Sequence, residues 1–261
     1  KIIDQFYAGK EIFLEKKDID LYPNQFLMFI TNSNNKKTAL AKFINYSTPI
    51  KKVNGDINKK GIWGVRPRNK EQSFAADLLM DPNIPIVSLV GKAGSGKTLL
   101  AIAAGLAQIM ESEKISRYKR LVVSRPIQPL GKDIGYLPGS MEEKMAPWIA
   151  PIQDNLQFLM GSDRETVKMY IENGTIEIEA LTYIRGRSIS DAYIIIDEAQ
   201  NLTSHELKTI LTRVGEGTKI VLTGDIEQID NVYIDETTNG LTHAVEKFKK
   251  YDLAGHVTLV K

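Results

Sequence analysis

The sequence contains no cysteine, and this absence removes two classes of site at once. Without thiols the chain can form no disulfide framework and offers zinc no thiolate ligand. It also lacks any apolar run that approaches the ~18 residues of a membrane-spanning helix, and its first residues lack the apolar core of a signal peptide. We therefore expect a cytoplasmic protein that has no membrane anchor.

Neither sign of charge dominates, since 34 Lys and Arg are balanced by 32 Asp and Glu and leave a formal net charge of +2. So small an excess does not by itself indicate a nucleic-acid binder, although local clusters of basic side chains can still make one. Hydrophobic residues make up 43% and charged residues 25%, the composition of an ordinary globular domain. The 261 residues allow one large domain, or a medium domain and a small one.

The first part of the chain has a β-rich pattern. Apolar stretches at 26–30 and 38–44 flank a short Asn-rich run that favours a turn, which indicates a hairpin. Beyond this part, strands alternate with helices. We therefore expect a small β-rich segment or connector over residues 1–64 and the main domain over residues 65–261.

The main domain shows the pattern of a parallel sheet wrapped by helices. Most of its expected strands are short apolar runs, as in strands buried on both faces. They lie at 84–90, 121–123, 176–181, 192–196, 219–223 and 257–260. The clearest helix follows Thr203, because Thr203 and Glu206 fit a capping box ahead of an apolar stripe. We predict a doubly wound α/β fold.

The run Gly91-Lys92-Ala93-Gly94-Ser95-Gly96-Lys97-Thr98 matches the phosphate-binding P-loop in full, between an apolar strand and a helical pattern. Its glycines let backbone N–H groups turn toward phosphate oxygens, and the positive end of the following helix points at the same anion. In this interpretation Lys97 neutralises the β- and γ-phosphates of ATP, and Thr98 offers its hydroxyl to Mg²⁺. The alternative, glycines that only make a turn, leaves the flanking strand and helix unexplained.

Two carboxylates, Asp197 and Glu198, end another apolar strand at the edge where open α/β sheets bind ligands. We expect Asp197 to hold Mg²⁺ through water, and Glu198 to orient the attacking water or accept its proton. An acidic pair after a strand is equally often a solvated loop, but the accompanying P-loop favours the functional interpretation.

Two glutamines are further candidates. Gln228 follows the strand at 219–223, and its amide suits a contact with the γ-phosphate and the attacking water. A polar turn is the alternative there. Gln72 lies on a helical pattern ahead of the P-loop and is a candidate for reading an adenine edge, although surface glutamines on helices are common.

Taken together, these residues resemble a PhoH-like ATPase, a family related in its motifs to the superfamily 1 helicases. The resemblance runs from about Gly61 to Lys261. Its motifs, in order, are 68–72, the P-loop 91–98, 124–127, 135–139, 183–188, 197–201, and Gly224-Asp225 with Gln228. The resemblance implies a single RecA-like ATPase core and supports the adenine role of Gln72. It also implies that some members carry an N-terminal PIN ribonuclease domain and act on RNA.

This chain departs from that pattern at both ends. The first 64 residues are too short for a PIN domain and show no convincing set of metal-binding carboxylates, so they resemble the connector that precedes the ATPase core. The chain begins without methionine and stops in an apolar run, and we expect it to be a fragment. The family continues past Lys261 with a motif that contains an arginine. If that arginine acts on a neighbouring ATP, this chain is expected to hydrolyse ATP poorly.

Only 33 residues follow Gln228, far fewer than a second RecA-like domain needs. We expect a neighbouring copy to complete the ATP site in a head-to-tail ring, and the resemblance implies a hexamer. Arg185 and Arg187 are candidates for stabilising charge on the transferred phosphoryl group; an RNA phosphate or a nearby carboxylate is their alternative partner. Nucleic-acid contact is expected at Ser124-Arg125-Pro126 and at 132–136, although Arg125 also suits a nucleotide phosphate.

Three functions stay open. The first is Mg²⁺-dependent ATP hydrolysis coupled to binding, translocation or unwinding of single-stranded RNA, which predicts RNA-stimulated, salt-sensitive activity. The second is a nucleotide-gated oligomeric scaffold that regulates a nuclease partner, which predicts ATP-dependent assembly without RNA stimulation. The third, a small-molecule kinase, is weaker because Glu198 and Gln228 suit activation of water rather than positioning of an acceptor.

Overall fold

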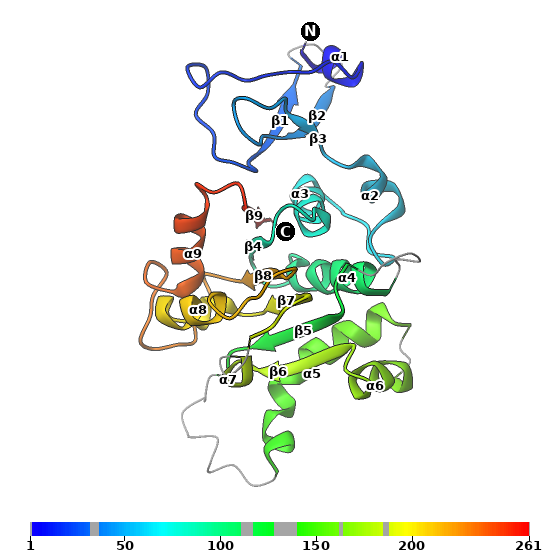
Figure 1. Ribbon diagram of the computed structural model, residues 1–261, viewed down its shortest axis with the longest axis vertical. Helices are drawn as coiled ribbons and strands as arrows, with labels where there is room; N and C mark the ends of the chain where they lie inside the picture. The colour runs from blue at the N-terminus through cyan, green and yellow to red at the C-terminus, as the bar shows by residue number, and fades with distance from the viewer. Residues whose placement is uncertain are drawn as a thin grey trace.

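The computed structural model describes residues 2–31, 37–110, 117–127, 140–161, 164–184 and 188–260. A small antiparallel sheet lies at one end of the molecule, and a larger sheet with helices on both faces lies at the other (Figure 1). This arrangement confirms the predicted α/β class, the parallel sheet and the small β-rich segment ahead of it. Within the described residues, every helix is too short or too polar to cross a membrane.

The N-terminal segment contains the predicted hairpin. Strands β1 (Phe26–Ile30) and β2 (Thr38–Lys42) pair antiparallel, and the short β3 (Lys51–Lys52) joins β2 on its other side. The helix α1 (Ile2–Tyr7) packs on β2 and contributes apolar side chains to a separate small core. Next along the chain, α2 (Gly55–Lys60) begins at Asn54, whose side chain accepts a hydrogen bond from the Asp56 N–H.

The main sheet has six parallel strands in the order β6-β5-β7-β8-β4-β9. All six predicted strands are present, with ends that shift by up to three residues. Their bounds are β4 Ile86–Gly91, β5 Arg120–Arg125, β6 Ile176–Ala180, β7 Ala192–Ile196, β8 Lys219–Gly224 and β9 Ala254–Leu259. Every residue of β7 and β8 is buried, because helices cover both faces of the sheet centre.

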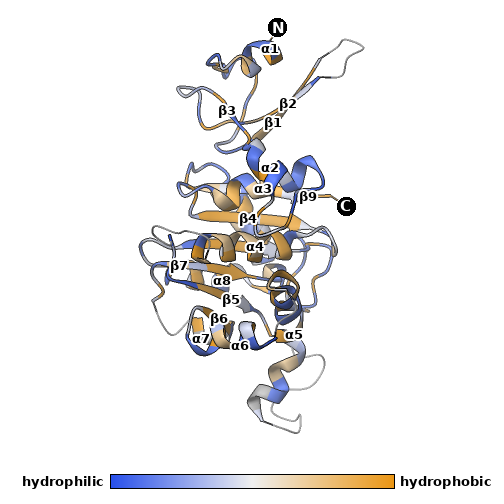
Figure 2. Ribbon diagram, turned by 90° about the vertical axis from the view of Figure 1, so that its right-hand side faces the viewer, coloured by the Kyte–Doolittle hydropathy of each residue, from blue (hydrophilic) through white to orange (hydrophobic). Residues whose placement is uncertain are grey.

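Alternate side chains of the strands feed two apolar cores, one on each face of the sheet. On β8, for example, Val221 joins one core and Leu222 the other. Figure 2 shows the hydrophobic colouring concentrated on the strands and on the inner sides of the helices. The helices that contribute to the first core are α3 (Lys70–Met80), α4 (Lys97–Met110), α5 (Met141–Leu159) and α6 (Arg164–Glu172), and those of the second are α7 (Leu181–Ile184), α8 (Ser204–Leu211) and α9 (Gly240–Phe248).

Polar contacts join the N-terminal segment to α3 and to β9 of the larger sheet. The Lys42 ammonium lies 2.8 Å from an Asp77 oxygen and 2.7 Å from an Asp81 oxygen, and its side chain is buried. Burial lowers the pKa of Lys42, but the two carboxylates outweigh it, so the net pKa is raised. At a second contact, Asn24 donates from its side chain to the Ala254 carbonyl of β9 at 2.8 Å.

Candidate functional site

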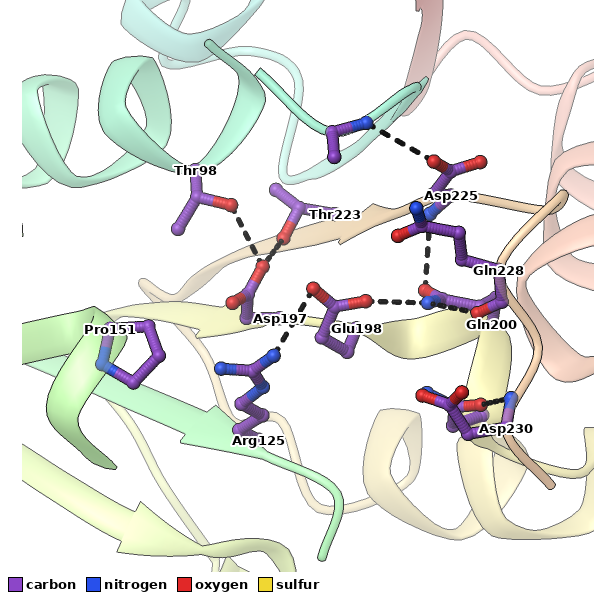
Figure 3. A network of polar contacts seen from close by, with 12 residues as sticks. Thr98, Arg125, Pro151, Asp197, Glu198, Gln200, Thr223, Asp225, Gln228 and Asp230 are labelled. Carbon is purple, nitrogen blue, oxygen red and sulfur yellow. Dashed lines mark hydrogen bonds and ion pairs between the residues drawn. The ribbon is translucent and has the colours of Figure 1, made fainter. Parts of the chain in front are cut away.

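The order of the strands assembles the site. Strand β8 lies between β4 and β7, so the segments that follow these three strands meet at one edge of the sheet. The P-loop follows β4, the acidic pair follows β7, and the segment of Asp225 and Gln228 follows β8. Figure 3 shows side chains from all three segments converging.

The P-loop has the backbone that phosphate binding requires. Gly94 and Gly96 have φ angles of 78° and 86°, in the left-handed region that favours glycine. Immediately afterwards α4 begins at Lys97, whose buried ammonium donates to the Lys92 carbonyl at 3.4 Å. The Ser95 hydroxyl is buried and lacks a hydrogen-bond partner among the described residues. A loop with this unpaired donor, an inward lysine and a helix N-terminus fits a phosphate group.

The predicted Mg²⁺ ligands lie together. The Thr98 hydroxyl donates to Asp197 Oδ1 at 2.9 Å, although Thr98 and Asp197 are 99 residues apart. Thr223 donates to the same oxygen at 2.6 Å from the end of β8. A hydroxyl and a carboxylate are the hard oxygen donors that Mg²⁺ prefers, and both border the phosphate-binding loop, so these residues fit the ion.

Glu198 has a strained backbone and two side-chain partners. Its φ and ψ are 53° and 39°, a left-handed conformation that costs a non-glycine residue on the order of 1 kcal/mol or more. One carboxylate oxygen accepts a hydrogen bond from Arg125 Nη2 at 3.3 Å, and the other accepts one from the Gln200 amide. Strain of this kind persists where surrounding contacts hold a residue for a functional reason.

Gln200, in the short 3₁₀ helix η2 (Ala199–Asn201), links the acidic pair to the segment after β8. Its side chain is fully buried, donates to the Gln228 carbonyl at 2.9 Å and accepts from the Asp225 N–H at 3.1 Å. Asp225 in turn accepts from the P-loop N–H of Ala93 at 3.2 Å. The three segments therefore form one hydrogen-bonded unit (Figure 3). Gln200 has no predicted role from the sequence, where it is part of the motif 197–201 alone.

Gln72 lies beside the P-loop. Its amide donates to the Ser95 carbonyl at 3.0 Å and accepts from the Arg68 N–H at 2.8 Å. A side chain on Gly96 would come within 3.1 Å of this amide, so glycine there allows the close approach. The position is next to the proposed phosphate site, and the adenine contact itself stays a prediction.

Comparison with known proteins adds a family to this geometry. A family model described as PhoH-like protein matches residues 64–261, which is most of the chain. The chain belongs to the PhoH-like family.

Curated relatives match this PhoH-like chain over nearly all of its length. Protein PhoH2 of Bacillus subtilis is 50% identical over 264 aligned residues, which cover 100% of this chain and 59% of the relative. Protein PhoH2 of Mycolicibacterium smegmatis is 39% identical, and the alignment covers 98% of this chain and 56% of the relative. The chain thus spans little more than half the length of these relatives. Among solved structures, a PRRSV helicase aligns at 12% identity with a TM-score of 0.32, and the alignment covers 92% of this chain and 42% of the helicase chain.

The remaining predicted residues of the PhoH-like chain divide into two groups. Arg185, Arg187 and the expected nucleic-acid loop at 132–136 lie outside the described residues. Lys92, in contrast, is exposed in the P-loop and forms an ion pair with Glu227 at 2.9 Å, which raises the pKa of Lys92. The P-loop lysine that is buried, and therefore suited to an enclosed phosphate, is Lys97.

Proposed function

We propose that this PhoH-like chain hydrolyses Mg²⁺-bound ATP and couples hydrolysis to single-stranded RNA. One observation carries the hydrolysis proposal: the P-loop, the Thr98–Asp197 pair and Glu198 lie together at neighbouring strand ends. A phosphate-binding loop alone would fit many nucleotide-binding proteins. The carboxylate of Glu198 beside it adds a group able to act on water.

Each residue has a separate task in this proposal. The P-loop N–H groups and the Lys97 ammonium bind the phosphates and offset their charge. Bound Mg²⁺, held by Thr98 and Asp197, supplies Lewis-acid stabilisation of charge on the phosphate oxygens. Glu198 orients the attacking water and accepts its proton, while Gln228 contacts the γ-phosphate.

The RNA part of the proposal rests on Arg125. This arginine ends β5 at the same edge of the sheet, and its side chain is about a quarter exposed at 23%. A guanidinium at this place suits a phosphate of a strand that passes over the site. We further propose that a neighbouring copy completes the ATP site in a head-to-tail ring, a hexamer, as the resemblance to the family implies.

The first test is steady-state ATP hydrolysis by a chain extended to the length of its relatives, with and without single-stranded RNA, at low and moderate salt. We expect RNA to raise the rate, and salt to reduce that rise because phosphate contacts release counterions. A flat response to RNA, together with an oligomer size that depends on ATP in sedimentation, would instead support the nucleotide-gated scaffold.

Two substitutions test the assigned residues. Lys97→Ala should abolish ATP binding, because the main phosphate countercharge is removed. Glu198→Gln should retain binding and lose hydrolysis by roughly 10²- to 10⁴-fold, the usual contribution of a general base. Lys168→Ala and Glu172→Gln, on the exposed face of α6, are matched controls that should change neither. Equal hydrolysis by Glu198→Gln and wild type would refute the role of Glu198.

A further inference from the structure

Both carboxylate oxygens of Glu198 are already engaged by protein groups. Arg125 Nη2 lies 3.3 Å from Oε1, and the Gln200 amide donates to Oε2. A group that activates water must present an oxygen to that water and lose its negative charge when it takes the proton. The ion pair with Arg125 opposes both events, because it orients Oε1 toward β5 and depends on the charge of Glu198.

The two partners of Glu198 differ in how firmly they are held. Gln200 is fully buried and tied by hydrogen bonds to Asp225 and Gln228, so it is part of the rigid unit that joins the strand ends. Arg125 is the last residue of β5, and its side chain, like that of Glu198, is about a quarter exposed. The Arg125 contact is therefore the one that an external anion can reach and break.

The anion that suits Arg125 better than one carboxylate oxygen is a phosphate diester. A guanidinium binds phosphate through paired N–H donors. Its contact with Glu198 is instead a single hydrogen bond of 3.3 Å, longer than the usual upper limit of about 3.2 Å. Salt weakens a partly exposed ion pair of this kind, and a multivalent strand competes with it strongly.

We propose that Arg125 is a positioning residue that holds Glu198 in a resting orientation and exchanges this carboxylate for a phosphate of a bound single-stranded RNA. The exchange frees Oε1 of Glu198 to face water, while Gln200 keeps the carboxylate at the site. The inference rests on the proposed function and deepens it, because it gives RNA stimulation a structural cause.

Thermodynamic linkage makes the idea measurable in both directions. If bound RNA weakens the Arg125–Glu198 contact by some factor, the contact must weaken RNA binding by that same factor. Couplings of this type usually amount to about 5- to 150-fold. Removal of Arg125 should therefore free Glu198, as bound RNA does. Removal of the charge of Glu198 should leave Arg125 free for RNA.

The hydrolysis test compares Arg125→Ala with wild type, each with and without single-stranded RNA. We expect the basal rate of Arg125→Ala to rise to the RNA-stimulated rate of wild type, and stimulation by RNA to disappear. The matched control is Arg120→Ala at the other end of β5, where the arginine forms an ion pair with Glu177 at 2.8 Å. This control should keep the basal rate and the stimulation of wild type. Arg125→Ala with an unchanged or lower basal rate, or with stimulation retained, overturns the proposal.

A binding test needs no hydrolysis, and its first comparison, Glu198→Gln with wild type, does not depend on how well Arg125→Ala folds. Fluorescence anisotropy with a labelled single-stranded RNA should show about 5-fold or tighter binding by Glu198→Gln than by wild type. The same substitution in an Arg125→Ala background should bring no such gain. An equal gain in both backgrounds would mean that loss of negative charge alone explains it, and would overturn the proposal.

Failure of the proposed function gives a different result from failure of this inference. A wild type that hydrolyses no ATP, or whose rate ignores RNA, removes the coupling function and the inference with it. A wild type that RNA stimulates, alongside an Arg125→Ala variant that RNA stimulates equally, leaves the coupling function intact and removes only the role of Arg125.

Discussion

Asp197 receives hydrogen bonds from two threonines that have different roles in the proposed site. Thr98 and Asp197, which lie 2.9 Å apart, are the residues that would hold Mg²⁺. Thr223 is fully buried behind Asp197 and is free to keep its hydrogen bond at 2.6 Å. Groups of this second kind orient a ligand without touching the metal.

Removal of the Thr223 hydroxyl should therefore weaken Mg²⁺ binding. For Thr223→Val we expect roughly 10-fold more Mg²⁺ to be needed for half-maximal ATP hydrolysis, because the loss of such a supporting contact commonly costs 10- to 100-fold in metal affinity. Thr223→Ser keeps the hydroxyl and should retain most of the affinity. A Mg²⁺ titration that is the same for Thr223→Val and wild type would contradict the supporting role.

At this scale the sequence predicted the residues that lie in continuous motifs. The P-loop and the pair Asp197-Glu198 could be recognised because neighbours in sequence are also neighbours in the site. The contact between Arg125 and Glu198 could not, because it depends on β5 lying beside β7, and a list of strands does not give their order. Thr223 was missed for the same reason, since its contact with Asp197 depends on β8 lying beside β7. Gln200 lies inside the run 197–201, but its contacts with Asp225 and Gln228 depend on the same pair of strands.

At the scale of elements, β4 and β9 share a polar pair in which Ser88 is buried and His256 is half-buried. Ser88 on β4 faces His256 on β9, with the Ser88 hydroxyl 3.0 Å from Nδ1, and Thr258 lies 3.1 Å from Nε2. Burial lowers the pKa of His256 to about 4. The imidazole is therefore neutral in the folded protein at neutral pH.

The lowered pKa of His256 predicts a loss of stability in acid. In the unfolded chain this histidine takes up a proton near pH 6.5, whereas in the folded protein it does so only near pH 4. The unfolded state thus binds more protons between these values, and the free energy of unfolding falls as the pH drops from 6.5 to 4, by roughly 2 kcal/mol. Thermal unfolding of His256→Gln between pH 7 and 4.5 should show a smaller decrease than wild type.

The control for this measurement is His243→Gln, at an exposed position on α9. It should keep the acid sensitivity of wild type. If His256→Gln loses as much stability on acidification as His243→Gln does, other groups cause the effect.

The elements themselves were mostly predictable, since buried parallel strands are short apolar runs and the capping box of α8 is present as expected, with Thr203 and Glu206 in their predicted roles. The long helix α5 was not predicted. It contains Pro147 and Pro151 within its length, and proline inside a helical pattern is normally a signal against a continuous helix. Its burial is limited to a few side chains such as Ile152 and Leu156, so its periodic apolar signal is weak.

At the scale of the whole molecule, Lys42 makes a charged connection between the small sheet and α3. It comes from β2 of the small sheet and pairs with Asp77 and Asp81 near the end of α3, the helix that carries Gln72 near its start. Burial raises the pKa of Asp81, but hydrogen bonds from Lys42 and the Asn83 N–H, together with the charges of Lys42 and Lys219, outweigh it, so the net pKa is lowered. Lys42 and Asp81 therefore carry opposite charges in the folded protein at neutral pH.

Loss of this lysine should destabilise the protein strongly. Lys42→Met leaves two half-buried carboxylates without their cation, and breaking a buried ion pair in this way usually costs about 3 to 5 kcal/mol. Urea unfolding followed by circular dichroism measures the change. Lys168→Met, which removes an exposed pair with Glu172 on α6, should cost less than about 1 kcal/mol. A loss for Lys42→Met as small as this control would show that the two sheets do not depend on the cluster.

The position of β9 beside β4 also has a consequence during synthesis on the ribosome. β4 carries the P-loop, yet one of its two edges is covered only by β9, which ends at Leu259. At translation rates of about 5 to 20 residues per second, the nascent chain must wait on the order of 10 to 30 s between the emergence of these strands. During this interval a hydrophobic strand edge stays open to other chains, so chaperone binding to nascent chains is expected to concentrate there.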